Sequence, residues 1–333
     1  MRILIVKPSS LGDVVHALPT VARLRRLFPG AHLAWLINRE LSPLLDHCPL
    51  VNDRIEFDRH GAATWLPLLA RLRRERFDLV VDLQGLLRSG LMTSATRAPR
   101  RLGLSDAREG ARFFYNEIVS VPRAHAVERY LKVADHLGCP PGPVEFPLGL
   151  SPIPQHRSLI AVHPSARWAT KLWGDDRFTE LIRRLPAERV VMTGSAVDCA
   201  RVDTILEAAR FGASVAPRNL AGQTGLFALA ELFARCAVVI TNDSGPMHLA
   251  AAVGTPVVAI FGPTDPALTG PYGKGHVVLR SGIPCSPCLK DHCPHTPRME
   301  CMSLVTVARV LAAVQPFLAQ GRFDTASGVA AAL

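Results

Sequence analysis

One segment near the N-terminus combines a glycine with an acidic residue: Ser9-Ser10-Leu11-Gly12-Asp13-Val14-Val15-His16. Gly12 would let the backbone approach a ligand closely, because it has no Cβ. Asp13 falls in the first turn of a predicted helix, where a carboxylate commonly caps free backbone amides. A carboxylate on the floor of a cleft could instead stay ionised and act as a general base. The spacing alone favours the cap and leaves the catalytic role open.

A second segment, Asn242-Asp243-Ser244-Gly245-Pro246, joins a predicted strand over 237–241 to a predicted helix over 247–253. The amides of Ser244 and Gly245 would lie at a helix N-terminus, which favours a phosphate through its free N–H groups and its dipole. Capping and a tight turn would explain the same residues. His248 follows on the helix, where a core histidine is the alternative to a ligand-binding one. The segment is neither a dinucleotide fingerprint nor a Walker loop.

The third group of candidate functional residues consists of basic side chains. Lys171 lies between a predicted loop over 164–170 and a predicted helix over 172–185. It could pair with a leaving diphosphate, although an ordinary surface lysine is the alternative. Arginines crowd the first half of the chain and suit an acidic partner: Arg88, Arg97, Arg100, Arg101, Arg108, Arg112, Arg123 and Arg129. Aromatic residues make up only 6% of the chain, and no known nucleic-acid-binding motif interleaves with these arginines. We therefore expect no nucleic-acid partner.

Four of the eight cysteines lie between residues 285 and 301. Cys285 and Cys288 form a CxxC pair, and Cys293 and Cys301 follow, so the ligand types and rough spacing fit a structural zinc site. The spacing is irregular and no second CxxC occurs, which leaves packed or partly oxidised loop cysteines as the alternative. A catalytic metal is not expected.

Two halves of the chain position these residues, and each half opens with a strand, a loop and a helix. Continuous apolar runs predict buried parallel strands over 2–6, 32–37, 77–83, 159–163, 189–193, 237–241 and 257–261. A proline-rich polar stretch over 148–157 indicates a linker, and residues 305–318 a final helix. We predict an α/β protein with a Rossmann-like domain over 1–150, a second over 158–310, and a terminal helix and tail over 311–333. The parallel sheets would face a central cleft, where ligands bind at the carboxyl ends of strands.

Composition limits the class of protein. The chain has 333 residues, of which 48% are hydrophobic and 20% charged, so it is neither disordered nor fibrous. The net charge of +10 comes mainly from arginine, which binds carboxylates and phosphates bidentately. No apolar run is long enough for a signal-peptide core or a membrane-spanning helix. We expect a cytoplasmic protein whose membrane contact is peripheral.

Together these segments resemble glycosyltransferase family 9, the ADP-heptose–lipopolysaccharide heptosyltransferases, over nearly the whole chain. Segments of the first half are similar to heptosyltransferase I: MRILIVKPSSLGDVVHALP, DLQGLLRSG, SDAREGARFFYN and HAVERYLKVADHLG. Segments of the second half follow the general family pattern: HPSARWATKLW, NLAGQTGLFALAELFARC, TNDSGPMHLAAAVGTP and FGPTDP. The CSPCLKDHC stretch is more like heptosyltransferase II, which leaves the acceptor sugar open.

The resemblance implies a GT-B fold, with an acceptor domain followed by a domain that binds the ADP-sugar. It implies inverting transfer of heptose from ADP-L-glycero-D-manno-heptose to the Kdo region of lipopolysaccharide, without a metal or other cofactor. Asp13 falls on the catalytic base, which reverses the preference for a simple cap. The donor site would comprise Ser10, Gly12, Ser165, Lys171, Gly194, Asp243, Ser244, Gly245 and His248. The acceptor site would comprise Arg88, Arg108 and Arg129.

The implied partners are ADP-heptose and a Kdo-bearing lipid A acceptor at the inner leaflet, bound by a monomer peripheral to the inner membrane. Heptosyltransferase II or another family 9 transferase is the alternative within the family. A sugar-nucleotide epimerase or hydrolase is a second alternative, because two facing Rossmann-like halves also occur there. A zinc-stabilised anion-binding protein is a third, based on the net charge and the cysteines.

Overall fold

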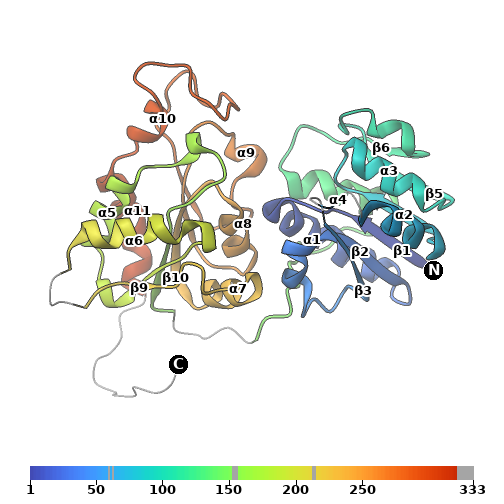
Figure 1. Cartoon of the computed structure of the whole chain (residues 1–333), viewed down its shortest axis with the longest axis horizontal. Helices are drawn as coiled ribbons and strands as arrows, with labels where there is room; N and C mark the ends of the chain where they lie inside the picture. The colour runs from blue at the N-terminus through green and yellow to red at the C-terminus, as the bar shows by residue number, and fades with distance from the viewer. Residues whose placement is uncertain (59–60, 62–63, 152–156, 212–214, 321–333) are drawn as a thin grey trace.

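The structure is a computed structural model that describes residues 1–58, 61, 64–151, 157–211 and 215–320. Two α/β domains lie side by side, the N-terminal one at the right of Figure 1 and the C-terminal one at the left. The middle of the predicted linker, residues 152–156, lies outside the described residues, as does the predicted tail beyond residue 320.

The N-terminal domain contains a six-stranded parallel sheet in the order β3-β2-β1-β4-β5-β6. Its strands are β1 (Arg2–Val6), β2 (His32–Asn38), β3 (Asp53–Phe57), β4 (Leu79–Asp82), β5 (Arg100–Leu104) and β6 (Glu117–Val119). Its α-helices are α1 (Leu11–Leu27), α2 (Trp65–Arg74), α3 (Leu87–Ala95) and α4 (Ala126–His136). Two 3-10 helices are η1 (Arg39–Leu45) and η3 (Ala111–Phe114).

The C-terminal domain repeats this plan with the strand order β12-β11-β10-β7-β8-β9, again all parallel. Its strands are β7 (Leu159–His163), β8 (Val190–Met192), β9 (Arg218–Asn219), β10 (Cys236–Asn242), β11 (Val257–Ile260) and β12 (Val277–Leu279). Its α-helices are α5 (Asp175–Arg183), α6 (Cys199–Ala209), α7 (Leu226–Ala234), α8 (Gly245–Ala252), α9 (Pro266–Thr269), α10 (Glu300–Ser303) and α11 (Val307–Gln320). Short 3-10 turns are η4 (Ala169–Lys171), η5 (Ala187–Arg189) and η6 (Ala196–Asp198).

The predicted strands over 2–6 and 159–163 coincide with β1 and β7. Both are apolar runs because helices cover both faces of each sheet, which leaves no face for polar side chains. The helix predicted from Leu172 begins only at Asp175, since Gly174 has φ +115°, which a helix does not accommodate. The last helix includes Val307, Val310 and Val314 in the core of the C-terminal domain.

One apolar core runs across the boundary between the domains. It joins Val14 and Leu18 of α1 to Phe233 of α7 and Met247 of α8, all at most 1% exposed. Because α1 packs against its own sheet and the other domain, almost its whole first two-thirds is buried. The first turns of α1 and α8 therefore lie together between the domains (Figure 1). No described helix is long and apolar enough to cross a membrane.

Candidate active site

Asp13 lies in the first turn of α1, just after the carboxyl end of β1. Its Oδ2 accepts hydrogen bonds from the backbone N–H of Ser10 at 3.0 Å and from the Ser10 hydroxyl at 2.9 Å. The cap is therefore formed, but by one carboxylate oxygen only. The other oxygen, Oδ1, accepts from the Tyr130 hydroxyl at 3.3 Å and lies 3.8 Å from Lys7 Nζ. The side chain is 39% exposed, so a ligand can reach it.

Lys7 controls the charge state of this carboxylate. It is the first residue after β1, its side chain is only 3% exposed, and its Nζ lies 5.3 Å from the centre of the Tyr130 ring. Burial alone would raise the pKa of the Asp13 carboxyl, but the Lys7 ammonium and the hydrogen bonds from Ser10 outweigh it and hold that pKa below its ordinary value. Asp13 is thus ionised at neutral pH, as a proton acceptor must be.

A second charged group faces the same space from the C-terminal domain. Lys171 Nζ lies 2.7 Å from Asp243 Oδ2 and 4.8 Å from the centre of the Trp168 ring. The same Asp243 oxygen accepts from the Thr264 hydroxyl at 2.5 Å, and Asp243 is 4% exposed. These contacts hold the ammonium at the end of β10, because Asp243 directly follows that strand. The arrangement presents a positive charge on a rigid support.

The first turn of α8 adds backbone donors beside that charge. Ser244 precedes the helix, and the N–H groups of its first turn have no partner within the helix. They open, with Asp13 and Lys171, onto a cavity of about 460 Å³ between the domains. Its lining residues are Ser10, Leu11, Gly12, Asp13, His16, Arg167, Trp168, Lys171, Asp243, Ser244, Gly245, Pro246, His248, Thr264 and Thr269. A carboxylate, an ammonium and a helix N-terminus thus share one cavity.

Two glycines allow the first turns of α1 and α8 to approach this closely. A Cβ on Gly12 would lie 2.3 Å from Cδ2 of His248, and a Cβ on Gly245 would lie 2.9 Å from Cδ2 of Leu11. The His248 ring also lies against His16 of α1, with 2.9 Å between His16 Nε2 and His248 Nδ1. Burial lowers the pKa of His248 to about 4 and that of His16 well below its ordinary value, so both rings are neutral at neutral pH.

A second cavity of about 430 Å³ adjoins the first and shares Ser244 and Gly245 with it. Ser165 and Gly194 line it, so it contains the remaining two predicted donor residues. The Ser165 hydroxyl is buried, and no described group hydrogen bonds to it in this structure. Asp198 also lines the cavity. Burial would raise the pKa of its carboxyl, but hydrogen bonds from the hydroxyl and the backbone N–H of Ser195 outweigh it and hold that pKa below its ordinary value. Apolar and polar side chains line this cavity together, and a concave site of this kind can bind a small molecule.

A third cavity of about 300 Å³ lies on the other side of Asp13, within the N-terminal domain. It brings together two of the three predicted acceptor arginines, Arg108 and Arg129, with Lys7 and Tyr130. Arg88 is not among the residues that line it. Arg129 forms an ion pair with Asp106, whereas no described carboxylate lies within 4.0 Å of Arg108. Asp13 therefore borders both a basic cavity and the cavity between the domains.

The four clustered cysteines do not form the zinc site that their spacing allowed. Among the described residues, no three His, Cys, Asp or Glu side chains are arranged to hold a metal ion. The thiol of Cys293 instead accepts a hydrogen bond from the backbone N–H of Met299 at 3.3 Å, and Cys301 is buried in α10. All four are free thiols. Cys285, Cys288 and Cys293 are each half-buried in the loop before α10.

Several site residues were not singled out from the sequence. Lys7 could have been, because it follows a central strand at the carboxyl edge where ligands bind in parallel sheets. His16 lies one helical turn after Asp13 and was a weaker signal of the same kind. Tyr130 and Thr264 reach the site from distant parts of the chain, so no local pattern marks them.

Comparisons with known proteins identify the family to which this chain belongs. The model of glycosyltransferase family 9 (heptosyltransferase) matches residues 65–298. The two facing domains form the GT-B fold of glycosyltransferases. The chain belongs to glycosyltransferase family 9 and is a glycosyltransferase.

Individual relatives agree with this assignment. The chain is 32% identical to lipopolysaccharide heptosyltransferase 1 of Pseudomonas aeruginosa, over 93% of this chain and 92% of that protein. The structure of Escherichia coli ADP-heptose lipopolysaccharide heptosyltransferase II is similar, with a TM-score of 0.77 and 28% identity, over 96% of this chain and 99% of that one. The Escherichia coli heptosyltransferase WaaC, solved with ADP, has a TM-score of 0.77 at 24% identity, over 95% and 100% of the two chains. The last likeness shows the fold alone.

Proposed function

We propose that the protein is an inverting heptosyltransferase of lipopolysaccharide core synthesis, with ADP-L-glycero-D-manno-heptose as donor and a Kdo–lipid A precursor as acceptor. The observation that carries this proposal is the position of Asp13. One of its oxygens is held by Ser10, and the residue lines both a basic cavity and the cavity that contains Lys171. Direct transfer of a sugar requires a base that lies between the bound acceptor and the diphosphate of the donor. The relatives' names support heptose as the sugar.

In the proposed reaction, Asp13 Oδ1 takes the proton of the acceptor hydroxyl while that oxygen attacks the anomeric carbon. The bond from this carbon to the diphosphate oxygen breaks on the opposite face, so ADP leaves with the bonding electrons and the configuration inverts. A positioned base contributes about 10²–10⁴-fold in rate. No metal or other cofactor takes part in this step.

Lys171 and the first turn of α8 would stabilise the departing diphosphate. Charge-stabilising contacts of this kind contribute about 3–4 kcal/mol each. Asp243 would act through Lys171 rather than on the phosphates, because its carboxylate is buried against the ammonium and Thr264. The adjoining cavity with Ser165 and Gly194 would hold the adenosine.

The acceptor would lie in the cavity with Lys7, Arg108 and Arg129. These cations suit the carboxylates of Kdo and the phosphates of lipid A, because guanidinium groups bind both bidentately. One chain lines all three cavities, so the proposed working unit is a monomer. With these substrates, the enzyme would work in the cytoplasm, peripheral to the cytoplasmic face of the inner membrane.

Product analysis tests this function directly. The purified protein is incubated with ADP-heptose and Kdo₂-lipid A, and the linkage formed is determined by NMR. We expect transfer to Kdo with an anomeric configuration opposite to that of the donor. Retained configuration, or ADP-heptose turnover that does not depend on an acceptor, would contradict the proposal.

Heptosyltransferase II activity is the second candidate. The 28% identity and full-length match to a solved heptosyltransferase II favours it. A parallel assay with a monoheptosylated acceptor separates the two functions. Faster transfer to the acceptor that already carries one heptose would assign the chain to this second activity.

A further inference from the structure

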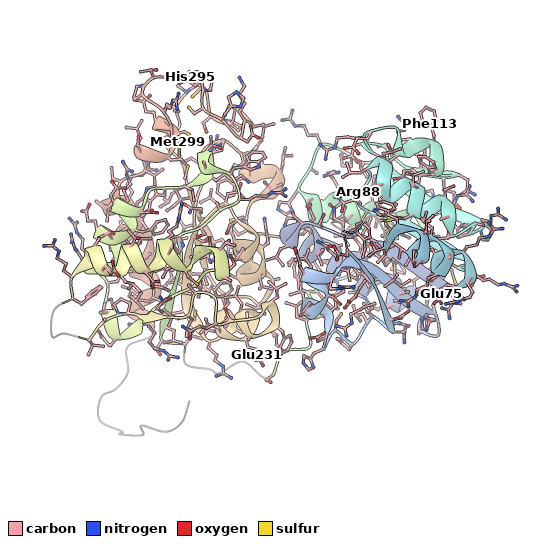
Figure 2. All side chains as sticks on the ribbon, in the orientation of Figure 1. Glu75, Arg88, Phe113, Glu231, His295 and Met299 are labelled. Atoms are coloured by element: carbon pink, nitrogen blue, oxygen red, sulfur yellow. The ribbon has the colours of Figure 1, made fainter. Side chains whose placement is uncertain are left out.

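The surface formed by α3 and η3 exposes three large apolar side chains. Phe113 of η3 is 92% exposed and projects from the upper edge of the N-terminal domain in Figure 2. Leu87 and Leu91, one helical turn apart on α3, are 45% and 44% exposed. A phenyl ring so fully in water is unusual, since Phe belongs to the residues that are most often buried.

The two elements that carry these side chains, α3 and η3, pack together. A Cβ on Gly90 of α3 would lie 2.5 Å from Cδ2 of Phe114 and 3.3 Å from Cα of Ala111. Phe114 is thus turned inward onto α3, and its neighbour Phe113 is turned outward. We call this surface, with Leu87, Leu91 and Phe113, the α3–η3 face.

Three arginines lie on the same elements as these apolar side chains or in the loop that joins β5 to η3. They are Arg88, Arg108 and Arg112, and none has a carboxylate within 4.0 Å among the described residues. Several other arginines of the domain are paired, as Arg100 is with Glu117. The loop has two acidic residues: Asp106 pairs with Arg129, and Glu109 Oε2 accepts a hydrogen bond from the backbone N–H of Leu87 at 3.2 Å. The face therefore combines exposed apolar side chains with arginines that no described carboxylate pairs.

The α3–η3 face borders the basic cavity next to Asp13. Arg108 lines that cavity, and its backbone N–H donates to the carbonyl of Gly85 at 2.8 Å. Gly85 lines the cavity too and precedes α3. A surface bound to this face would lie beside the space that we assign to the acceptor.

We propose that the α3–η3 face docks on an anionic lipid surface, with Phe113, Leu87 and Leu91 entering the interface and the arginines binding lipid phosphates. This inference rests on the proposed function, which gives the enzyme a lipid-anchored acceptor. A stable protein dimer buries about 1,200–2,000 Å², more than three part-exposed side chains supply. Interfacial binding needs only a few apolar anchors combined with basic charge. Charge complementarity therefore favours a lipid surface over a second copy of this chain.

Vesicle co-sedimentation of the full chain tests the docking face. The vesicles are phosphatidylcholine alone, or phosphatidylcholine with phosphatidylglycerol, at low and high salt. We expect binding to the anionic vesicles only, weakened by salt. Phe113→Ser should weaken it about tenfold, and Arg112→Ala about fivefold. The matched controls Val215→Ser and Arg235→Ala alter exposed side chains of the C-terminal domain and should bind like the wild type.

Wild-type binding by Phe113→Ser and Arg112→Ala, or equal binding to neutral vesicles, would overturn the docking face. A wild-type dimer in the absence of lipid that Phe113→Ser dissociates would also overturn it, because the face would then be a protein interface. A transfer assay separates this inference from the proposed function. Both variants should lose activity on vesicle-embedded acceptor and keep it on a deacylated, soluble acceptor. If the wild type transfers heptose to neither, the proposed function fails, while the vesicle result still decides the docking face.

Discussion

His16 Nε2 and His248 Nδ1 lie 2.9 Å apart and join the helix that carries Asp13 to the helix that follows Asp243. These residues are 232 positions apart in the chain. The contact fixes the distance between the proposed base and the proposed phosphate site, because each histidine is within one helical turn of its functional neighbour. We therefore expect a change in the geometry of this junction to lower activity even where the proposed base and phosphate site are intact.

Gly12→Ala tests the junction sterically. The added Cβ would lie 2.3 Å from the His248 ring, so the ring must move away from His16 or the domains must separate. We expect a loss of about 1–3 kcal/mol in stability and at least a tenfold loss of kcat/KM, measured by thermal unfolding and the transfer assay. Gly30→Ala is the matched control, because a Cβ there meets nothing within 4 Å. Equal behaviour of the two variants would contradict the steric account.

The same junction predicts a pH dependence of stability. Burial lowers the pKa of His248 to about 4, while an unfolded histidine titrates near 6.5. The unfolded chain therefore takes up protons first, and stability should fall as the pH drops from about 6.5 towards 4. His125, His163 and His276 also have lowered pKa values and contribute to this slope. His248→Gln should flatten the dependence of Tm on pH, and an unchanged slope would show that His248 does not take part.

Lys171→Ala should weaken both donor binding and catalysis, because the diphosphate carries charge before and after the sugar leaves. The loss of one such contact corresponds to about 10²–10³-fold in kcat. Steady-state kinetics against ADP-heptose measures both parameters. Lys274→Ala removes an exposed lysine of the same domain and should behave like the wild type. If the donor KM and kcat of Lys171→Ala were unaltered, Lys171 would have no role at the diphosphate.

Lys7→Met tests how the base is kept ionised. The Lys7 ammonium holds the pKa of Asp13 below its ordinary value, so its removal should raise that pKa. The acid limb of the kcat/KM profile should then move to higher pH, whereas Lys132→Met, a surface change in the same domain, should leave it in place. If the acid limb of Lys7→Met lay at the same pH as that of the wild type, another group would determine the pH of that limb.

Sequence patterns predicted those parts of the site that depend on neighbours along the chain. The end of β1 and the first turn of α1 follow from local apolar and capping signals, so Asp13 and Ser10 could be located in advance. Contacts between distant segments could not. The approach of Tyr130 to Asp13, the pairing of His16 with His248 and the displacement of Arg88 from the acceptor cavity all depend on how helices and domains pack. Cys285 and its neighbouring cysteines show the opposite case. Their side chains are of a type that binds zinc, but the structure does not arrange these four residues to hold a metal ion.

Asp13→Asn tests the central claim most directly, through turnover and ADP affinity measured on the same preparation. Asparagine can still accept from Ser10 through its amide oxygen, so the cap is kept while the proton acceptor is lost. We expect kcat to fall by at least about 10²–10⁴-fold, with nearly unchanged ADP affinity by calorimetry. Near-normal turnover of this variant would show that Asp13 is not the base.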